Sequence, residues 1–202
     1  MAATPADDLR DRIGLYLRSH RTMTLATMGP PPQASPAGSS RVAAAGAGRP
    51  AVAPPAGAVD TAGELLVGPG PDTAVAPHAA SVFYAVDDAL RLIFLSKPTS
   101  SHGLHIASSA AVAVTVTEQY DDWELIQGVQ LWGRAKRLRG AAKAAGMAVY
   151  LRRFPFVREL MDQPRLAESV RSVAVYRVEP DRVAFTDNTT GVFGREVLDL
   201  EG

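Results

Sequence analysis

The chain has 202 residues, 47% of them hydrophobic, and its 21 Lys and Arg residues balance its 21 Asp and Glu residues. This suits a globular protein with a sizeable core, and zero formal charge gives no general attraction to nucleic acid or acidic membranes. The chain contains no cysteine, which excludes disulfides and thiolate chemistry. With no signal-peptide pattern and no apolar run that could span a bilayer, we expect a cytoplasmic protein without membrane or nucleic-acid partners.

The N-terminal region predicts a helix followed by a strand. Thr4 and Pro5 suit the start of a helix, and apolar residues then recur at helical spacing at Leu9, Ile13, Tyr16 and Leu17. The stretch 23–27 is typical of a strand.

The segment from Gly29 to Gly63 differs from the rest in composition. It consists almost entirely of Pro, Ala, Gly and Ser, with no aromatic residue, so it cannot bury enough apolar surface to become ordered. We predict a single domain, 1–202, that carries a low-complexity flexible insertion at about 29–72. Two roles stay open for this insertion, an inert loop and a mobile lid.

The remaining chain predicts a sheet of short strands with helices between them. Strands are expected at 79–86, 90–96, 111–117 and 127–139, with helices at 101–109, 141–154 and 156–161. A hairpin is expected from 173–178 and 182–185 across Glu179-Pro180-Asp181. The strand at 127–139 carries an unusual polar face that includes Gln130 and Trp132, which indicates a pocket or a subunit contact. Six or seven short strands joined by tight turns favour an antiparallel barrel.

The segment Leu92–His102 is the strongest candidate for a binding site. An apolar strand runs into a group of hydroxyls, one lysine and one histidine, where a helix begins. The first N–H groups of a helix lack partners and carry partial positive charge, which suits a bound phosphate. The alternative is that Ser100 only caps the helix, and the segment alone leaves both readings open.

Other kinds of site find little support. His102 and His105 could share one helix face, with His78 as a third ligand, but no Cys or carboxylate cluster accompanies them, so we predict no metal site. The chain has no Gly-x-Ser-x-Gly elbow and no Gly-x-x-x-x-Gly-Lys loop. Its basic run between Arg134 and Arg158 suits a solvated or anion-contacting face in a chain of balanced charge.

Four segments, taken in order, resemble one known family. They are Thr22–Thr27, Pro77–Ala85, Leu92–Ser96 with Ser100-Ser101-His102, and Ile126–Gly133. In this order the chain resembles the pyridoxamine 5′-phosphate oxidase-like, FMN-binding split-barrel family. The resemblance implies a mainly β (α+β) fold with flanking helices around a six-stranded antiparallel Greek-key split barrel. It also implies a homodimer with the cofactor at the subunit interface.

The resemblance also implies which residues hold FMN. The flavin ring would lie along the strand residues Ser81, Val82, Phe83 and Tyr84, with Gln130 and Trp132 at its edge. The phosphate would be held by Ser96, Lys97, Ser100, Ser101 and His102. The oxidases carry Ser-Arg-Lys where this chain has Ser100-Ser101-His102, so this chain has fewer permanently positive side chains at these positions.

The resulting hypothesis is an FMN-binding oxidoreductase that acts on a small molecule. The flavin would carry the hydride chemistry, so no side chain needs to be an essential acid or base, and no catalytic residue is predicted. Two alternatives keep the fold: a barrel that binds F420 or haem, with a histidine as axial ligand, and a non-catalytic flavin-binding or structural dimer. The substrate and the electron donor stay open.

Overall fold

The computed structural model describes residues 4–30, 75–163, 172–191 and 194–200. The insertion that the sequence predicts at about 29–72 lies outside the described residues, apart from Gly29 and Pro30. Its two possible roles therefore stay predictions.

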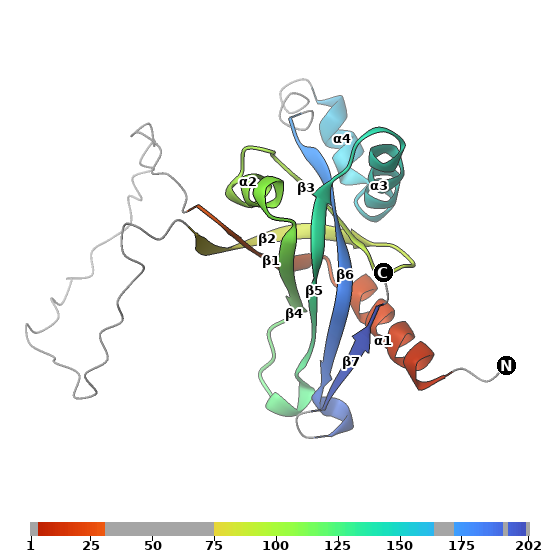
Figure 1. The fold of residues 1–202 in the computed structure, drawn as a ribbon. Coiled ribbons are helices and arrows are strands. Elements are labelled where there is room, and N and C mark those ends of the chain that lie inside the picture. The colour runs from red at the N-terminus through yellow and green to blue at the C-terminus, as the bar shows by residue number, and fades with distance from the viewer. Residues whose placement is uncertain (1–3, 31–74, 164–171, 192–193, 201–202) are drawn as a thin grey trace, which may run out of the picture. The chain divides into compact units, whose positions relative to one another are not determined.

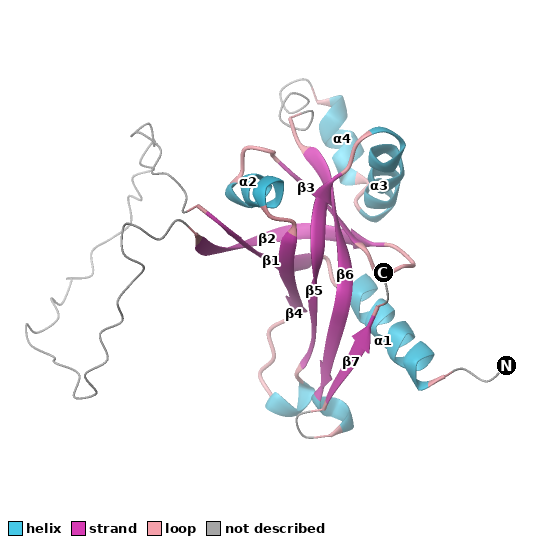
Figure 2. Ribbon diagram, viewed as in Figure 1, coloured by secondary structure: helices cyan, strands magenta, loops and turns pink. Residues whose placement is uncertain are grey.

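Seven antiparallel strands form one sheet that closes on itself (Figure 1, Figure 2). The order is β3-β2-β1-β4-β5-β6-β7, and β3 also pairs with β6, so six strands close the barrel and β7 extends it along β6. This confirms the predicted mainly β, six-stranded antiparallel barrel with flanking helices. The strands are β1 (Thr22–Gly29), β2 (Ala76–Val86), β3 (Leu92–Ser96), β4 (Ala111–Thr117), β5 (Gln127–Arg137), β6 (Ala174–Asp187) and β7 (Arg195–Asp199).

Alternation of large and small residues explains which way the strands face. On β4, Val112, Val114 and Val116 are buried in the barrel core, while Ala113 and Thr115 point outward. The same alternation on β1 buries its odd-numbered residues from position 23 and turns its even-numbered residues outward. The outside of the barrel therefore carries small uncharged side chains over the middle of β1 and β4.

The predicted hairpin near the C-terminus is wrong, because residues 174–187 form the single strand β6. Glu179-Pro180-Asp181 is an irregularity inside this strand, where its register with β5 shifts between Trp132 and Gly133. Proline has no N–H to donate, so it is tolerated at such a bulge. Before the bulge β6 pairs with β3, and after it with β7. The bulge thus marks the change of partner and leaves the chain direction unchanged.

In the part of the chain that the structure describes, four α-helices and two short 3₁₀ helices surround the barrel. They are α1 (Pro5–Ser19), α2 (Ser101–Ser108), α3 (Gly140–Arg153), α4 (Phe156–Asp162), η1 (Trp123–Leu125) and η2 (Asn188–Thr190). α2 joins β3 to β4 and packs its buried residue Ile106 on the core, whereas α3 and α4 cover a second apolar cluster that includes Ile93 and Val175. None of the helices in the described part of the chain is both long and apolar enough to cross a membrane.

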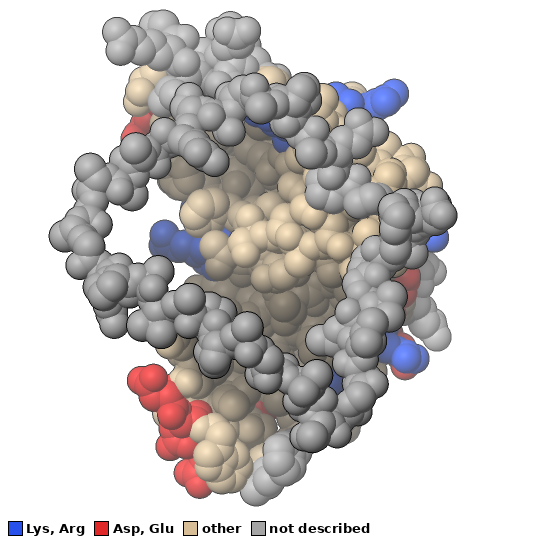
Figure 3. All heavy atoms as spheres, turned by 90° about the vertical axis from the view of Figure 1, so that its left-hand side faces the viewer, with Lys and Arg blue, Asp and Glu red and all other residues tan. Residues whose placement is uncertain are grey.

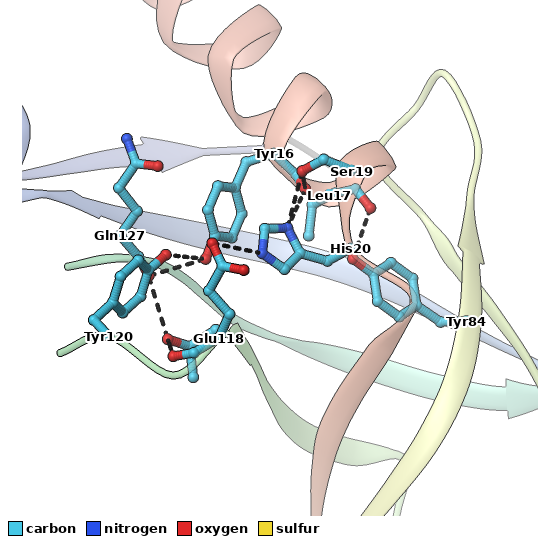
Figure 4. Close-up of polar contacts among 9 residues, drawn as sticks. Tyr16, Leu17, Ser19, His20, Tyr84, Glu118, Tyr120 and Gln127 are labelled. Carbon is cyan, nitrogen blue, oxygen red and sulfur yellow. Dashed lines mark hydrogen bonds and ion pairs between the residues drawn. The ribbon is translucent and has the colours of Figure 1, made fainter. Parts of the chain in front are cut away.

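Polar contacts join the last turn of α1 to β2, to the start of β5 and to the loop after β4 (Figure 4). The hydroxyl of Tyr16 donates to the carbonyl of Gln127 at 2.9 Å and lies 3.2 Å from the hydroxyl of Tyr120. From β2, the hydroxyl of Tyr84 donates to the carbonyl of Leu17 at 2.7 Å. Burial raises the pKa of both Tyr16 and Tyr84, so both hydroxyls stay protonated and able to donate.

Candidate functional site

The junction between β3 and α2 is a capped helix start. Ser100 has extended backbone angles, and its hydroxyl accepts a hydrogen bond from the N–H of Gly103 at 3.2 Å. The same hydroxyl donates to the carbonyl of Lys97 at 2.8 Å. Ser100 therefore caps α2, and its hydroxyl already has both a donor and an acceptor, while the phosphate contact expected at this junction stays a prediction.

Two more of the predicted phosphate contacts belong to the same hydrogen-bonded group. The hydroxyl of Ser96 lies 2.6 Å from Nε2 of His102 and 3.1 Å from the hydroxyl of Ser100. His102 is only 8% exposed, so it faces this group from beneath α2. By contrast, Lys97 is exposed and Ser101 is half-buried. Ser96 and Ser100 are half-buried as well, so a ligand that approached from outside would meet Lys97 first.

Three histidine side chains meet on the buried side of α2, and two of them, His102 and His105, belong to the helix itself. The His78 ring centroid lies 5.9 Å from that of His102 and 5.6 Å from that of His105. His105 is 2% exposed, with Nε2 at 2.9 Å from the carbonyl of Pro30 and Nδ1 at 3.0 Å from the hydroxyl of Thr27. Because a carbonyl only accepts, Nε2 donates to Pro30, and Nδ1 is the ring atom that faces the hydroxyl of Thr27. His105 thus fixes α2 to the end of β1.

His102 contributes no positive charge at neutral pH. Burial lowers its pKa below the ordinary 6.5, and the neighbouring His78 and His105 lower it further. Within the described residues, no group of three His, Cys, Asp or Glu side chains is placed to hold a metal ion. In the histidine group (His78, His102 and His105), His102 and His105 are buried and fix α2 through their hydrogen bonds, whereas His78 is half-buried.

The predicted ring contacts on β2 do not share a face. Ser81 and Phe83 are exposed, while Val82 is half-buried and Tyr84 is 1% exposed in the core. Successive strand residues point to opposite sides of a sheet, so a ligand outside the barrel could meet only the odd-numbered pair. Phe83 packs edge-on against Phe154, with ring centroids 5.5 Å apart.

Gln130 and Trp132 lie on an open face outside the barrel. With their neighbours on β1 and β4 they line a shallow hollow of about 230 Å³. We call this surface the outer face; its outward-pointing residues are Thr24, Ala26, Ala113, Thr115, Gln130 and Trp132. It is framed by Trp132, which is 40% exposed, and it carries no formal charge. Its floor is made of small side chains that leave room for a flat ligand.

A second hollow of about 590 Å³ lies on the other side of Trp132, over β6 and β7. The guanidinium carbon of Arg195 lies 5.9 Å from the centre of the Trp132 ring. Arg182 forms an ion pair with Asp199 at 2.6 Å in the same hollow. Trp132 therefore separates an uncharged surface from a charged one.

The sheet brings some of the predicted residues into one row. Ser81 pairs with Thr24, Thr24 with Thr115, and Thr115 with Gln130. At the usual spacing between strands, this row spans about 14 Å.

The described surface on the side of α2 and β4 is mostly uncharged, with charged atoms near its margins (Figure 3). Most predicted site residues thus form two groups, one at the start of α2 and one on the outer face, while Val82, Phe83 and Tyr84 belong to neither.

Sequence reasoning missed several members of these groups. Thr24 and Ala26 have no local signature of function, and Thr27 is 78 positions from the histidine it contacts. Ala113 and Thr115 could have been found, since the valine alternation on this strand turns them outward. Arg195, which lies in the second hollow and in neither group, follows Gly191 and Gly194, and no strand pattern marks it.

Comparison with known proteins supports the fold and identifies relatives. No protein-family model matches the chain. A haem-binding protein from Mycobacterium smegmatis has a similar structure, with a TM-score of 0.57 and 16% identity over 98% of this chain and 60% of that chain. A protein from Listeria innocua, described as a candidate pyridoxamine 5′-phosphate oxidase, gives a TM-score of 0.51 and 14% identity over 88% of this chain and 97% of that chain.

A closer relationship appears in sequence. A UPF0306 protein of Klebsiella pneumoniae is 36% identical over 119 residues, which are 58% of this chain and 73% of that protein. A UPF0306 protein of Escherichia coli O157:H7 is 35% identical over 124 residues, or 61% of this chain and 76% of that protein. The chain is thus a split barrel similar in fold to a haem-binding protein and to a candidate pyridoxamine 5′-phosphate oxidase, and it belongs to the UPF0306 family.

Proposed function

We propose that this protein is an FMN-binding oxidoreductase that acts on a small molecule, with the flavin ring on the outer face of a homodimer. The observation that carries the proposal is the open, uncharged hollow of small side chains bordered by Gln130 and Trp132. A flat aromatic ring needs such a surface, with a few polar groups to orient it. The fold shared with the Listeria innocua protein supports the same assignment.

The residues at the start of α2 fit a phosphate in part. Lys97 supplies a cation, Ser101 supplies a hydroxyl, and the first N–H groups of the helix point outward along its axis. Ser96, Ser100 and His102 are already bonded to one another. They would shape this corner from beneath and leave the direct contacts to Lys97, Ser101 and the backbone.

The outer face can orient a flavin without an essential acid or base. The amide of Gln130 both donates and accepts hydrogen bonds, which suits the polar edge of the ring. Ala26 and Ala113 leave the ring space, and Trp132 borders it. When bound, FMN supplies the hydride chemistry.

A second copy of the chain would complete the site. Met28 is 48% exposed and points outward on β1, beside the outer face, and Trp132 is also exposed. Exposed apolar side chains gathered on one surface are typical of an interface. The homodimer would cover this surface and enclose the ring, as part of a cytoplasmic enzyme.

Haem is a second candidate because the Mycobacterium smegmatis protein of similar fold binds it. His102 and His105 are buried under α2, and both nitrogens of His105 have partners. An axial bond from either would require α2 to move, so this version depends on the half-buried His78. F420 would use the same outer face as FMN, and a non-catalytic dimer would keep the surface without chemistry.

The proposal is tested by titrating the purified protein with FMN, F420 and haemin, and by measuring its mass by sedimentation. We expect FMN to bind with saturation to a dimer. Ala113→Glu, which puts a charge on the hollow, should weaken FMN binding by at least about tenfold. Ala142→Glu, at an exposed position of α3, is the matched control and should leave binding unchanged.

Four results would overturn parts of the proposal. Failure to bind FMN, or equal weakening by both variants, would remove the flavin site from the outer face. Saturable haemin binding with a Soret shift that His78→Ala abolishes would replace FMN with haem. FMN that binds but is reduced by neither NADH nor NADPH would favour the non-catalytic dimer.

A further inference from the structure

Three arginines surround a hollow that belongs to neither group of predicted site residues. The hollow, of about 260 Å³, lies between the last turns of α1 and α3 and the end of β2. Arg18 comes from α1, and Arg152 and Arg153 come from α3. Apolar side chains complete the lining, among them Leu17, Val86 and Val149. We call it the arginine pocket.

The positive charges of this pocket are poorly balanced. No Asp or Glu is among the described residues that line it. Arg18 lies 3.6 Å from Asp88, but the side chain of Asp88 is fully exposed (106%), so water screens this pair. Three guanidinium groups thus face one screened carboxylate in the described part of the chain.

Neutralising the helix ends accounts for only part of this arrangement. Basic residues are common in the last turn of a helix because they offset the negative end of its dipole. Arg153 has that role, since it donates to the carbonyl of His20, just after α1, at 3.1 Å. Arg18 instead folds back over its own helix: a Cβ added at Gly14 would lie 2.8 Å from its Nη1. Gly14 therefore makes room for a guanidinium beside the pocket.

The pocket also has an apolar wall. Leu17 is fully buried and Tyr84 nearly so, while Val86 and Val149 are half-buried and close to the opening. A free inorganic anion would contact the arginines but leave Val86 and Val149 exposed to water. A ligand that joins an anionic group to a short apolar part would use both.

We propose that the arginine pocket binds a small organic phosphate monoester. Its phosphate would lie against Arg18, Arg152 and Arg153, and its apolar part against Val86 and Val149. Guanidinium groups match phosphate oxygens with paired hydrogen bonds. Three cations suit the two negative charges of a phosphate monoester better than the single charge of a carboxylate.

This site is separate from the proposed flavin site. The arginine pocket is lined by α1, α3 and the end of β2, whereas the outer face is lined by β1, β4 and β5. Tyr84 and Val86 also lie at the opposite end of β2 from His78, which neighbours His102 of α2. Six residues of extended strand, from His78 to Tyr84, span about 20 Å. Because FMN is itself a phosphate monoester, the experiment must distinguish the two sites.

The test titrates the full chain with n-butyl phosphate, inorganic phosphate and n-butanoate by isothermal calorimetry. We expect n-butyl phosphate to bind at least about tenfold more tightly than either of the other two. Arg152→Ala should weaken it by at least about tenfold, and Arg158→Ala, at an exposed position of α4, should not. Arg152→Ala should leave FMN affinity unchanged.

Other outcomes would overturn the proposal. They are equal binding of butanoate and butyl phosphate, equal loss in Arg152→Ala and Arg158→Ala, or no binding of butyl phosphate. Arg153→Ala could loosen the contact between α3 and α1, so Arg152→Gln serves as the second variant. Its thermal unfolding should match the wild type while its affinity falls. If FMN affinity falls together with that for butyl phosphate, the two sites are one and the inference fails.

Discussion

The two groups of predicted site residues differ in how their polar atoms are used. Beneath α2, Ser96, Ser100 and His102 bond to one another, and His105 bonds to Thr27 and Pro30. On the outer face, Gln130 and Trp132 are exposed beside a hollow of small side chains. Both groups were expected to hold one cofactor.

This difference separates positioning from binding. Buried polar groups must be paired because an unpaired one is costly, so the cluster beneath α2 holds the helix in place. The outer face has small side chains that are open to solvent, and in the monomer it has no comparable structural role. Substitutions that break the hydrogen bonds beneath α2 should therefore reduce stability, and substitutions on the outer face should change binding alone.

The largest effect is expected for His105→Ala. The substitution removes the bonds to Thr27 and Pro30 and leaves a void under α2, so the free energy of unfolding should fall by roughly 2–4 kcal/mol. Urea unfolding measures it. Thr115→Ala on the outer face is the control and should change stability by less than about 0.5 kcal/mol. An equal loss of unfolding free energy in His105→Ala and Thr115→Ala would contradict the distinction between the cluster beneath α2 and the outer face.

Gly29→Ala tests the packing of α2 on β1 by changing a residue of β1. A Cβ at this position would overlap the His105 ring, whereas a Cβ at Gly128 would meet its nearest neighbour at 3.5 Å. We expect Gly29→Ala to lower the free energy of unfolding by about 1–3 kcal/mol. Gly128→Ala should stay within about 0.5 kcal/mol of the wild type. If thermal unfolding gives the same stability for Gly29→Ala and Gly128→Ala, position 29 does not lie as close to the His105 ring as the structure places it.

Ser100 can separate the cap from the phosphate contact. Ser100→Ala loses the bond from Gly103 N–H and should cost about 1 kcal/mol. Ser100→Asp keeps a capping oxygen and should retain stability, but its carboxylate should repel a phosphate and lower FMN affinity. Chemical unfolding and FMN titration measure the two properties. Unchanged FMN affinity in Ser100→Asp would place the phosphate elsewhere.

A smaller effect is expected from pH through His102. Its pKa is lowered in the folded protein, mainly by burial. Below the ordinary pKa of 6.5 the unfolded chain binds a proton that the native state does not, so stability is lost as pH falls from there toward the native value. Unfolding free energies at about pH 7.5 and about pH 5.5 should show this loss, and His102→Gln should reduce it. A steeper pH dependence in His102→Gln would contradict the burial of this histidine.

The sequence predicts the strands well where large and small residues alternate. β4 shows the pattern clearly, and its buried valines follow from it. β7 was missed because almost all its residues are exposed and no period marks it. Glu179-Pro180-Asp181 reads as a turn, but pairing with β5 on one side and with β3 and then β7 on the other keeps the strand continuous. Such long-range pairing leaves no local signal.

The candidate site was predictable to a similar extent. The capping role of Ser100 and the polar face with Gln130 and Trp132 follow from local patterns. The opposite orientation of Ser81 and Tyr84 also follows from strand alternation. The bond between Thr27 and His105 does not, since it depends on how α2 folds back over β1. The arginine pocket likewise requires the last turns of α1 and α3 to meet.

The most direct measurement of the central claim uses the chain's two tryptophans. Trp132 borders the outer face, whereas Trp123 lies in η1, beside η2. Tryptophan emission is recorded during FMN titration of Trp123→Phe and Trp132→Phe. We predict strong quenching in Trp123→Phe, where Trp132 is the remaining tryptophan, and much weaker quenching in Trp132→Phe at saturating FMN. Saturable FMN binding that quenches Trp123 as much as Trp132 would contradict a flavin on the outer face.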